Sequence, residues 1–461
     1  MNHFTPRSSL LTSLALAMAL AGCSTLRTPY EAPAMATPTQ WQQGTPTEAR
    51  DAREVTRQWW KAFDDPVLDS LVEAALQRNN DLAAAAVRVR KAQLQARLNA
   101  HRPNLSAGVN ASTQQPLDGG GSGRSSGASL GVSYEIDLWG RLDATHDAAL
   151  WEAQASAEDR EASAQTLVAT TATLYWQLAY YNQRLAASAQ SIAYAERTQT
   201  LVQAQYDAGA VSALETAESR QNLASQRAAL TQLQQRYVET SNALVLLFDG
   251  STLGPAAPGW AAPQTLPAAD LPPVAAGLPA QLLGNRPDLR AAELRLRGVL
   301  ATADATRLSF YPQLSLTGAL GSSSASLGNL LANPVATLGA GLVLPFLNQT
   351  EMRVRTESAR ADYELAVIQF RQTLYQAFTD VNNALSARTH YLAQGEQLTQ
   401  ALADARKAEQ LYEVRYRAGA VALKPWLDAQ EKRRSAETAL AENTLNRLTN
   451  HATLIQALGG L

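Results

Sequence analysis

Four short stretches of the chain alternate apolar and small polar residues, the pattern of a β-strand with two different faces. They come in two pairs, at about 103–138 and about 312–346, and each pair encloses a Gly/Ser-rich loop. The apolar positions of the first pair are Leu105, Ala107, Val109 and Ala111, followed by Leu130, Val132, Tyr134, Ile136 and Leu138. The last stretch, around 338–344, is more apolar throughout. The pattern predicts two β-hairpins.

The rest of the pattern is helical, with the same three segments in each half of the chain. These are a helix before the hairpin, a very long helix after it, and a shorter return helix. Their ranges are about 67–101, 142–206 and 214–247, and then 282–309, 350–416 and 425–457. At 1.5 Å per residue a long helix would measure about 98 Å. The two shorter helices together match that length, so we expect them to stack end to end beside the long one.

The two halves are copies of one unit, because three sequence matches recur in order at nearly constant spacing. The matching segments are Asn80-Asp81-Leu82 with Pro287-Asp288-Leu289, Arg102-Pro103-Asn104-Leu105 with Tyr311-Pro312-Gln313-Leu314, and Tyr206–Val211 with Tyr416–Val421. We therefore predict a first repeat at 67–248 with a tip turn at 207–213. A Pro/Gly/Ala-rich linker follows at 249–281, and then a second repeat at 282–461 with a tip turn at 417–424.

The N-terminus has the features of a secretory signal at residues 1–22. Arg7 supplies the positive charge, and a 12-residue apolar region at 10–21 is too short to cross a bilayer. The segment ends in Leu20-Ala21-Gly22-Cys23, which resembles a bacterial lipobox. We expect cleavage before Cys23, a covalent lipid on that cysteine, and a lipidated N-terminal segment at 23–66. By similarity to other bacterial lipoproteins, Ser24 favours delivery to the outer membrane.

Composition excludes several classes of protein. The 39 basic and 41 acidic residues give a net charge of −2, so the chain lacks the excess of positive charge that is typical of proteins that bind nucleic acid. One cysteine and five scattered histidines offer no cluster with metal-ligand spacing. No nucleophile–base pair stands out either, so we expect neither an enzyme nor a cofactor beyond the lipid.

The strand count predicts an assembly. Beyond residue 23 no apolar run is long enough for a membrane-spanning helix, so a membrane crossing would use β-strands. Four strands cannot close a barrel, eight leave a filled interior, and twelve from three chains leave a lumen. The predicted fold class is therefore mainly α with a membrane β-barrel, formed as a trimer. Aromatic residues where strands meet helices would form an interfacial belt: Trp139, Phe310, Tyr311 and Phe346.

Motifs along nearly the whole chain resemble the outer-membrane efflux protein family of TolC- and OprM-like channels, and within it the NodT-type lipoproteins. They are Trp59-Trp60-Lys61-Ala62-Phe63, Asp65-Pro66, Glu135–Arg141, Asn285-Arg286-Pro287-Asp288-Leu289, Tyr311-Pro312 and Leu344-Pro345-Phe346. The resemblance implies a homotrimer with a 12-strand barrel in the outer membrane and a helical tunnel in the periplasm. It also implies a passive channel that works with a periplasmic adaptor and an inner-membrane pump of the resistance-nodulation-division type.

The resemblance also implies two kinds of site at the tip turns. Adaptor docking is expected at Ala208, Gly209, Ala210, Ala418, Gly419 and Ala420. A periplasmic gate is expected at Tyr416, Asp428, Glu215, Glu218 and Tyr206. Val421 and Pro425 stand where some relatives carry an arginine and an acid, so the closure would be looser than an ionic lock.

Three other functions fit parts of the pattern. The first is an outer-membrane duct for type I protein secretion, and the second is a duct for metal cations. The third belongs to another class, a structural lipoprotein that braces the envelope, which would share the anchor and helices but would not need alternating hairpins.

Overall fold

The computed structural model describes residues 26–35, 38–42, 58–115, 117, 123–249, 260, 262–267, 271, 272, 274, 279, 282–325 and 334–460. The predicted signal peptide and Cys23 lie outside these residues. The chain divides into two compact units. The sheet unit comprises the described parts of 1–35, 88–157 and 291–372, and the helical unit those of 36–87, 158–290 and 373–461.

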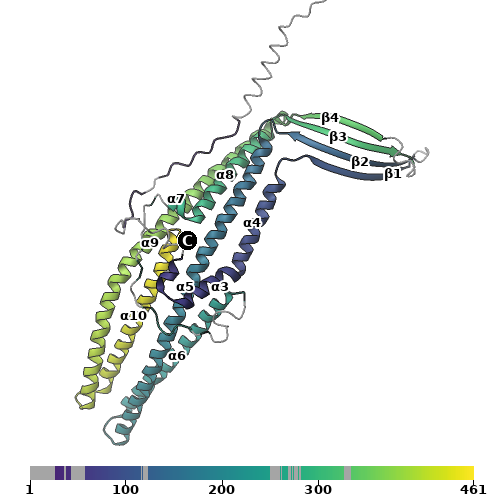
Figure 1. Ribbon diagram of the computed structural model, residues 1–461. Helices are drawn as coiled ribbons and strands as arrows, with labels where there is room; N and C mark the ends of the chain where they lie inside the picture. Colours follow the sequence, from purple (N-terminus) through teal and green to yellow (C-terminus); the bar gives the residue numbers. More distant parts are fainter. Residues whose placement is uncertain are drawn as a thin grey trace, which may run out of the picture. The chain divides into compact units, whose positions relative to one another are not determined.

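The two repeats contain matching elements in the same order (Figure 1). The first repeat comprises α3 (Pro66–Arg78), α4 (Asn80–Leu98), β1 (Asn104–Gln114), β2 (Gly123–Ile136), α5 (Arg141–Asp207) and α6 (Ala213–Leu246). The second comprises α7 (Leu282–Asn285), α8 (Pro287–Leu308), β3 (Gln313–Ser324), β4 (Pro334–Val343), α9 (Gln349–Arg417) and α10 (Leu423–Ala457). The 3₁₀ helices η2 (Trp59–Phe63) and η6 (Pro345–Leu347) precede α3 and α9. Among the described helices, none combines the length and hydropathy needed to cross a bilayer.

The sheet unit carries both hairpins in one antiparallel sheet. The strand order is β1-β2-β3-β4, so β2 of the first repeat pairs with β3 of the second (Figure 1). The register is continuous: Leu105 faces Val132, and Val132 faces Gly318, which in turn faces Leu338. Residues directly opposite one another lie on the same side of a sheet. The register therefore joins the alternating patterns of all four strands into two continuous faces.

The helix predicted before each hairpin is broken, which corrects the expectation of single segments at 67–101 and 282–309. In the first repeat Asn79 is extended (φ −69°, ψ 126°), and its Oδ1 accepts the Leu82 N–H at 2.9 Å, which caps α4. In the second repeat Pro287 begins α8 and disfavours helical geometry at Arg286. Both breaks arise from local residue chemistry.

The helical unit is organised around a cluster of buried aromatic and aliphatic side chains. Trp59 and Trp60 of η2 are buried with Trp176 of α5, and Phe63 packs against Trp176 with ring centroids 5.1 Å apart. Asp65 caps α3 by accepting the Val67 and Leu68 N–H groups, while its other oxygen accepts the Tyr175 hydroxyl at 2.7 Å. The end of the predicted N-terminal segment, residues 59–65, is thus tied to α5 by both burial and hydrogen bonding.

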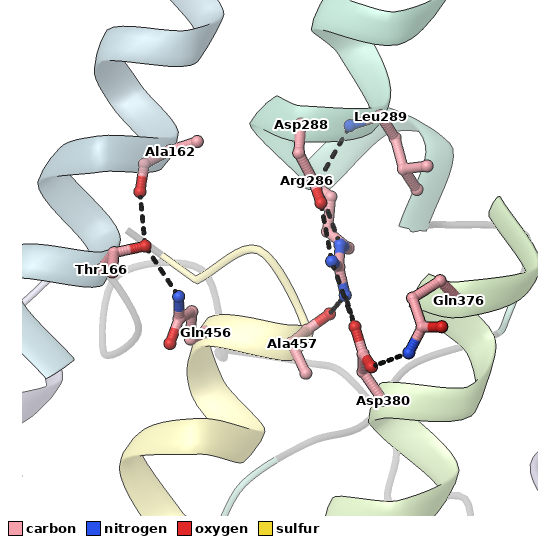
Figure 2. Close-up of polar contacts among 9 residues, drawn as sticks. All are labelled: Ala162, Thr166, Arg286, Asp288, Leu289, Gln376, Asp380, Gln456 and Ala457. Carbon is pink, nitrogen blue, oxygen red and sulfur yellow. Dashed lines mark hydrogen bonds and ion pairs between the residues drawn. The ribbon is translucent and has the colours of Figure 1, made fainter. Parts of the chain in front are cut away.

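Each return helix ends at the break in the helix before its hairpin, as expected if the two stack. Asn79 Nδ2 donates to the Leu247 carbonyl at 3.2 Å, just past the end of α6. At the equivalent place in the second repeat, Arg286 Nη1 donates to the Ala457 carbonyl at 3.1 Å, at the end of α10 (Figure 2). One position therefore joins the two helices in each repeat, with an amide in the first and a guanidinium in the second.

The second junction is an ionic staple formed by Arg286, Asp288 and Asp380. Arg286 lies 2.7 Å from Asp288 and 3.4 Å from Asp380 of α9, and only 12% of its side chain is exposed (Figure 2). Burial raises the pKa of Asp288, but the adjacent guanidinium outweighs that effect and holds the pKa below its usual value. The guanidinium also sits against the carbonyl end of α10, where a positive charge is favoured.

We predict that Arg286→Met lowers the free energy of unfolding by about 3 kcal/mol, because it leaves a partly buried aspartate and a helix-end carbonyl without their donor. Arg360→Gln, which removes an exposed ion pair on α9, should cost below about 0.5 kcal/mol. Urea unfolding of the purified protein in detergent would measure both. Because the pKa of Asp288 is lowered in the folded state, the Arg286–Asp288 ion pair should contribute fully to the free energy of unfolding above about pH 4. This contribution should disappear as the pH falls through the pKa of the folded state. Equal losses in the two variants would contradict the staple.

Candidate functional site

One face of the sheet is apolar across all four strands except near the loop ends, where Thr113, Ser126, Ser322 and Ser324 lie on the same side, and its apolar side chains are largely exposed. Its members are Leu105, Ala107, Val109, Ala128, Leu130, Val132, Tyr134, Ile136, Leu314, Leu316, Leu320, Ala336, Leu338, Ala340 and Leu342. Leu338 is 91% exposed. Arg124, near the loop end of β2, is the only charged residue among the paired positions on this side. Such a continuous apolar surface on an isolated chain marks a contact with lipid or another apolar medium.

The opposite face consists mostly of serine and glycine. Hydroxyl and amide side chains stand beside glycines on neighbouring strands: Ser106 beside Gly131, Asn110 beside Gly127, Ser315 beside Gly341 and Thr317 beside Gly339. A Cβ added at Gly131 would lie 2.7 Å from the Ser106 oxygen, so glycine makes room for the hydroxyl. Glu135, paired with Arg141 at 2.7 Å, is the only charged residue among the paired positions on this face.

The two tip turns have the same backbone geometry. Gly209 and Gly419 adopt left-handed conformations, with φ of 73° and 72°. In the first turn Gly209 N–H donates to Tyr206 and Ala210 N–H to Gln205, and Gly419 and Ala420 repeat this pattern with Tyr416 and Arg415. These are Schellman C-caps, for which glycine is the favoured residue. No atom lies within 4 Å of a Cβ built at either glycine, so both turns are open to a partner.

Tyr416 links the two helical hairpins near the tips. Its hydroxyl donates to Gln205 Oε1 of α5 at 2.7 Å, and its ring stacks on Trp426 of α10 with centroids 5.0 Å apart. Tyr416 is only 6% exposed, in a cluster with Val202, Leu423 and Leu427. Burial, together with the Glu215 carboxylate, raises the pKa of Tyr416. The tyrosine is therefore neutral at physiological pH and acts as a donor.

The predicted carboxylates have different local partners. Glu215 belongs to a capping box with Ser212: the Ser212 N–H and hydroxyl donate to Glu215, and the Leu214 N–H donates to the Ser212 hydroxyl. These hydrogen bonds lower the pKa of Glu215. Exposed Asp428 forms an ion pair with Lys424 at 2.8 Å. Asp428 raises the pKa of Lys424, and the field of Glu218 adds a smaller effect in the same direction.

A family model described as "Outer membrane efflux protein" matches residues 71–249 and 278–460, which together cover most of the chain and correspond to its two repeats. The chain belongs to the outer membrane efflux protein family.

Relatives and solved structures agree with this assignment. The chain is 34% identical to the pyoverdine export outer membrane protein OpmQ of Pseudomonas putida, covering 98% of this chain and 97% of that one. It is 31% identical to the toluene efflux pump outer membrane protein TtgC of a second P. putida strain, over 98% and 95%. The open-state structure of the MtrE outer membrane channel of Neisseria gonorrhoeae matches with a TM-score of 0.81 and 28% identity, over 94% and 98%.

Family membership and shared fold confirm the predicted fold class, the predicted function and the predicted location at the outer membrane. The fold class is that of the outer-membrane efflux channels, mainly helical with two β-hairpins in each chain. The protein is an outer-membrane efflux channel protein, and it acts at the outer membrane.

The four aromatic residues predicted to form an interfacial belt lie in different environments. Trp139 Nε1 donates to the Pro312 carbonyl at 2.8 Å and packs on Tyr311, which places both at the junction of sheet and helices. Phe346 is partly exposed in η6. The prediction is wrong for Phe310, which is only 7% exposed, because a side chain buried inside the unit cannot lie in an interfacial belt.

The structure also assigns positions to the tip residues. All six docking residues lie in or beside the two open turns, which span fewer residues than predicted because α6 begins at Ala213 and α10 at Leu423. Tyr206 is exposed, whereas Tyr416, its equivalent in the second repeat, is buried. Sequence reasoning missed Gln205 and Trp426, the partners of Tyr416, since they are unremarkable helical residues and only the fold brings them together.

We predict that Tyr416→Phe loosens the tips and raises single-channel conductance in planar bilayers, because it removes the bond to Gln205 while keeping the stacked ring. Tyr375→Phe is the matched control, since it makes the same change at an exposed tyrosine of α9 far from the tip. Conductance of this variant should stay at the wild-type value. Unchanged conductance in Tyr416→Phe, or an equal rise in both variants, would show that this bond does not restrain the tips.

Proposed function

We propose that three copies of this chain form a passive exit duct of a tripartite efflux pump. The duct would receive small molecules from a periplasmic adaptor and an inner-membrane pump of the resistance-nodulation-division type. It would release them outside the cell without a catalytic step or a cofactor. The observation that carries the proposal is the two-faced sheet in a member of the outer-membrane efflux family.

The sheet edges support the assembly. Among the described strands, β1 and β4 each pair on one side only. Open edges are not tolerated in a bilayer, so β4 of one copy would pair with β1 of the next. The strands contain 10 to 14 residues, and about 9 to 11 are enough to cross a membrane. Three copies give twelve strands with the apolar face toward lipid and the Ser/Gly face toward a lumen.

Exposed apolar side chains on the helices beside these edges support the same arrangement. Leu94 and Leu98 lie on one face of α4, which leads into β1, and Leu98 is 82% exposed. Val354, Leu365 and Ile368 are exposed along one face of α9, which follows β4. If β1 pairs with β4 of a neighbouring copy, α4 lies next to that copy's α9. The two apolar surfaces then cover one another.

The tips support docking and gating. The open Ala208–Ala210 and Ala418–Ala420 turns offer backbone and small side chains to the adaptor. Closure would rest on Tyr416 with its Gln205 bond, on the Lys424–Asp428 pair, and on the charge of Glu218. Glu215 would act indirectly, by holding the start of α6.

A lipid on Cys23 would anchor each copy to the outer membrane. The lipobox residues Leu20–Cys23 and Ser24 support this proposal. Several acyl chains hold a protein at a membrane far better than one, and a trimer multiplies the anchors.

The cargo is proposed as drugs or other small toxic compounds, since the almost uncharged Ser/Gly face selects against few molecules. A second candidate is pyoverdine. The relatives at 34% and 32% identity over 98% of this chain are both named for pyoverdine export. Deleting the gene would distinguish the two, because loss of drug export lowers the inhibitory concentration of antibiotics, whereas loss of pyoverdine export lowers the amount of pyoverdine in the medium.

A photo-crosslinking amino acid at Leu214 in living cells tests the tripartite assembly. Leu214 is exposed beside the first tip and, unlike Ser212, donates no side-chain bond to the capping box. Leu246, exposed at the far end of α6, is the control position. We expect Leu214 alone to capture a periplasmic adaptor that serves a proton-driven multidrug pump. Capture of an adaptor of an ATP-driven secretion system would shift the function to protein export, and capture of no adaptor would refute docking at the tips.

A further inference from the structure

The segment Leu26–Tyr30, here called the strap, is held in the sheet unit by side chains of α5 and α8. Arg307 of α8 donates to the Leu26 carbonyl, and Arg27 pairs with Asp147 of α5. Thr28 is bound by Asp304 of α8. Five consecutive residues of otherwise irregular chain therefore have a specific binding site.

Asp304 is the centre of this site. It is only 4% exposed. Its Oδ2 accepts the Thr28 N–H at 2.7 Å, and its Oδ1 accepts both the Thr28 hydroxyl and Arg307 Nη2 at 2.8 Å. A buried carboxylate is costly unless its acceptor positions are filled. The strap supplies two of the three donors, so Asp304 loses most of its hydrogen bonds to the protein if the strap leaves or shifts its register.

A second contact fixes the other end of the strap. The Arg297 guanidinium lies over the Tyr30 ring at 4.5 Å and over the Trp151 ring at 5.4 Å. Glu293 pairs with Arg297 at 2.7 Å and accepts the Tyr30 hydroxyl at 3.3 Å. This cation–π sandwich is independent of Asp304 and recognises an aromatic residue two positions after the threonine.

These contacts give the strap a direction. Leu26 meets Arg307, Thr28 meets Asp304, and Tyr30 meets Arg297, so the strap runs antiparallel to α8 with its first residue nearest the sheet. The side chain of Arg27 lies beside Gly140, where an added Cβ would be 3.4 Å from Arg27 Cδ. Gly140 follows Trp139, which packs on Tyr311 at the sheet–helix junction.

We propose that Asp304 is a positioning residue that locks the strap in register and so fixes where the lipid on Cys23 enters the membrane. This inference rests on the lipid anchor of the proposed function. Cys23 precedes Leu26 by three residues, which span at most about 10 Å. Cys23 is therefore within that reach of Leu26, and the neighbouring Arg27 side chain lies beside Gly140 near the sheet–helix junction. The acyl chains would then enter the bilayer near the helix end of the sheet.

Trypsin digestion of the purified full-length protein in detergent tests the register. Arg27 is the only basic residue in the strap. The Arg27–Thr28 peptide bond lies between the residues that Arg307 and Arg297 hold in place. The wild-type bond should resist trypsin, and Asp304→Asn should raise its rate of cleavage about tenfold, because the hydrogen bonds lose their charge. Thr28→Val keeps Asp304 and its pair with Arg307, so it should give a smaller rise without disturbing α8. Asp362→Asn, an exposed site on α9, should match wild type.

Mass spectrometry of the released peptide tests the lipid anchor separately from the binding of the strap. A peptide that begins at acylated Cys23 supports the anchor, and an unmodified one refutes both the anchor and the positioning role. Rapid cleavage of the wild type, or equal rates in wild type, Asp304→Asn and Thr28→Val, would overturn the strap while leaving an acylated anchor intact.

Discussion

The feature on which the rest of the structure depends is the register of the four-stranded sheet. Because Val132 of the first repeat faces Gly318 of the second, the two hairpins share one apolar and one Ser/Gly face. A shift by one residue in either hairpin would mix the faces and expose polar groups to lipid. Pairing of this sheet with the sheets of other copies of the chain would explain three further features. These are the duplicated helices, the exposed apolar side chains of α4 and α9, and the open edges of β1 and β4.

The two repeats share a fold but differ in how firmly each is fixed. At the junction of the stacked helices, the first repeat uses Asn79 and the second uses the charged Arg286 staple. At the tips the difference is reversed, since α6 begins with the Ser212–Glu215 capping box while Ala422, which begins α10, makes no side-chain cap. The second tip therefore lacks the helix cap of the first and is held instead by Tyr416 and by the Lys424–Asp428 pair.

Sequence patterns predict the elements well, because a period of two and long proline-free runs reflect local geometry. They do not predict the break at Asn79, since asparagine caps helices and also occurs within them. Phe310 shows a similar limit: its position next to a strand suggested an interfacial role, and only packing reveals that it is buried. The hydrogen bonds between Tyr416 and Gln205 and between Thr28 and Asp304 join residues more than 200 positions apart, and no local pattern encodes such contacts.

Cysteine labelling of Val132→Cys and Ser133→Cys tests the two-faced sheet most directly, because neighbouring residues on β2 are assigned to opposite faces. The native chain contains one cysteine, Cys23, whose thiol the proposed lipid would block. In intact outer membranes, a water-soluble maleimide should label Ser133→Cys and spare Val132→Cys, while a lipid-soluble maleimide should label Val132→Cys. Equal labelling of both positions by the water-soluble reagent, or the reverse preference, would contradict a sheet that separates lipid from a water-filled lumen.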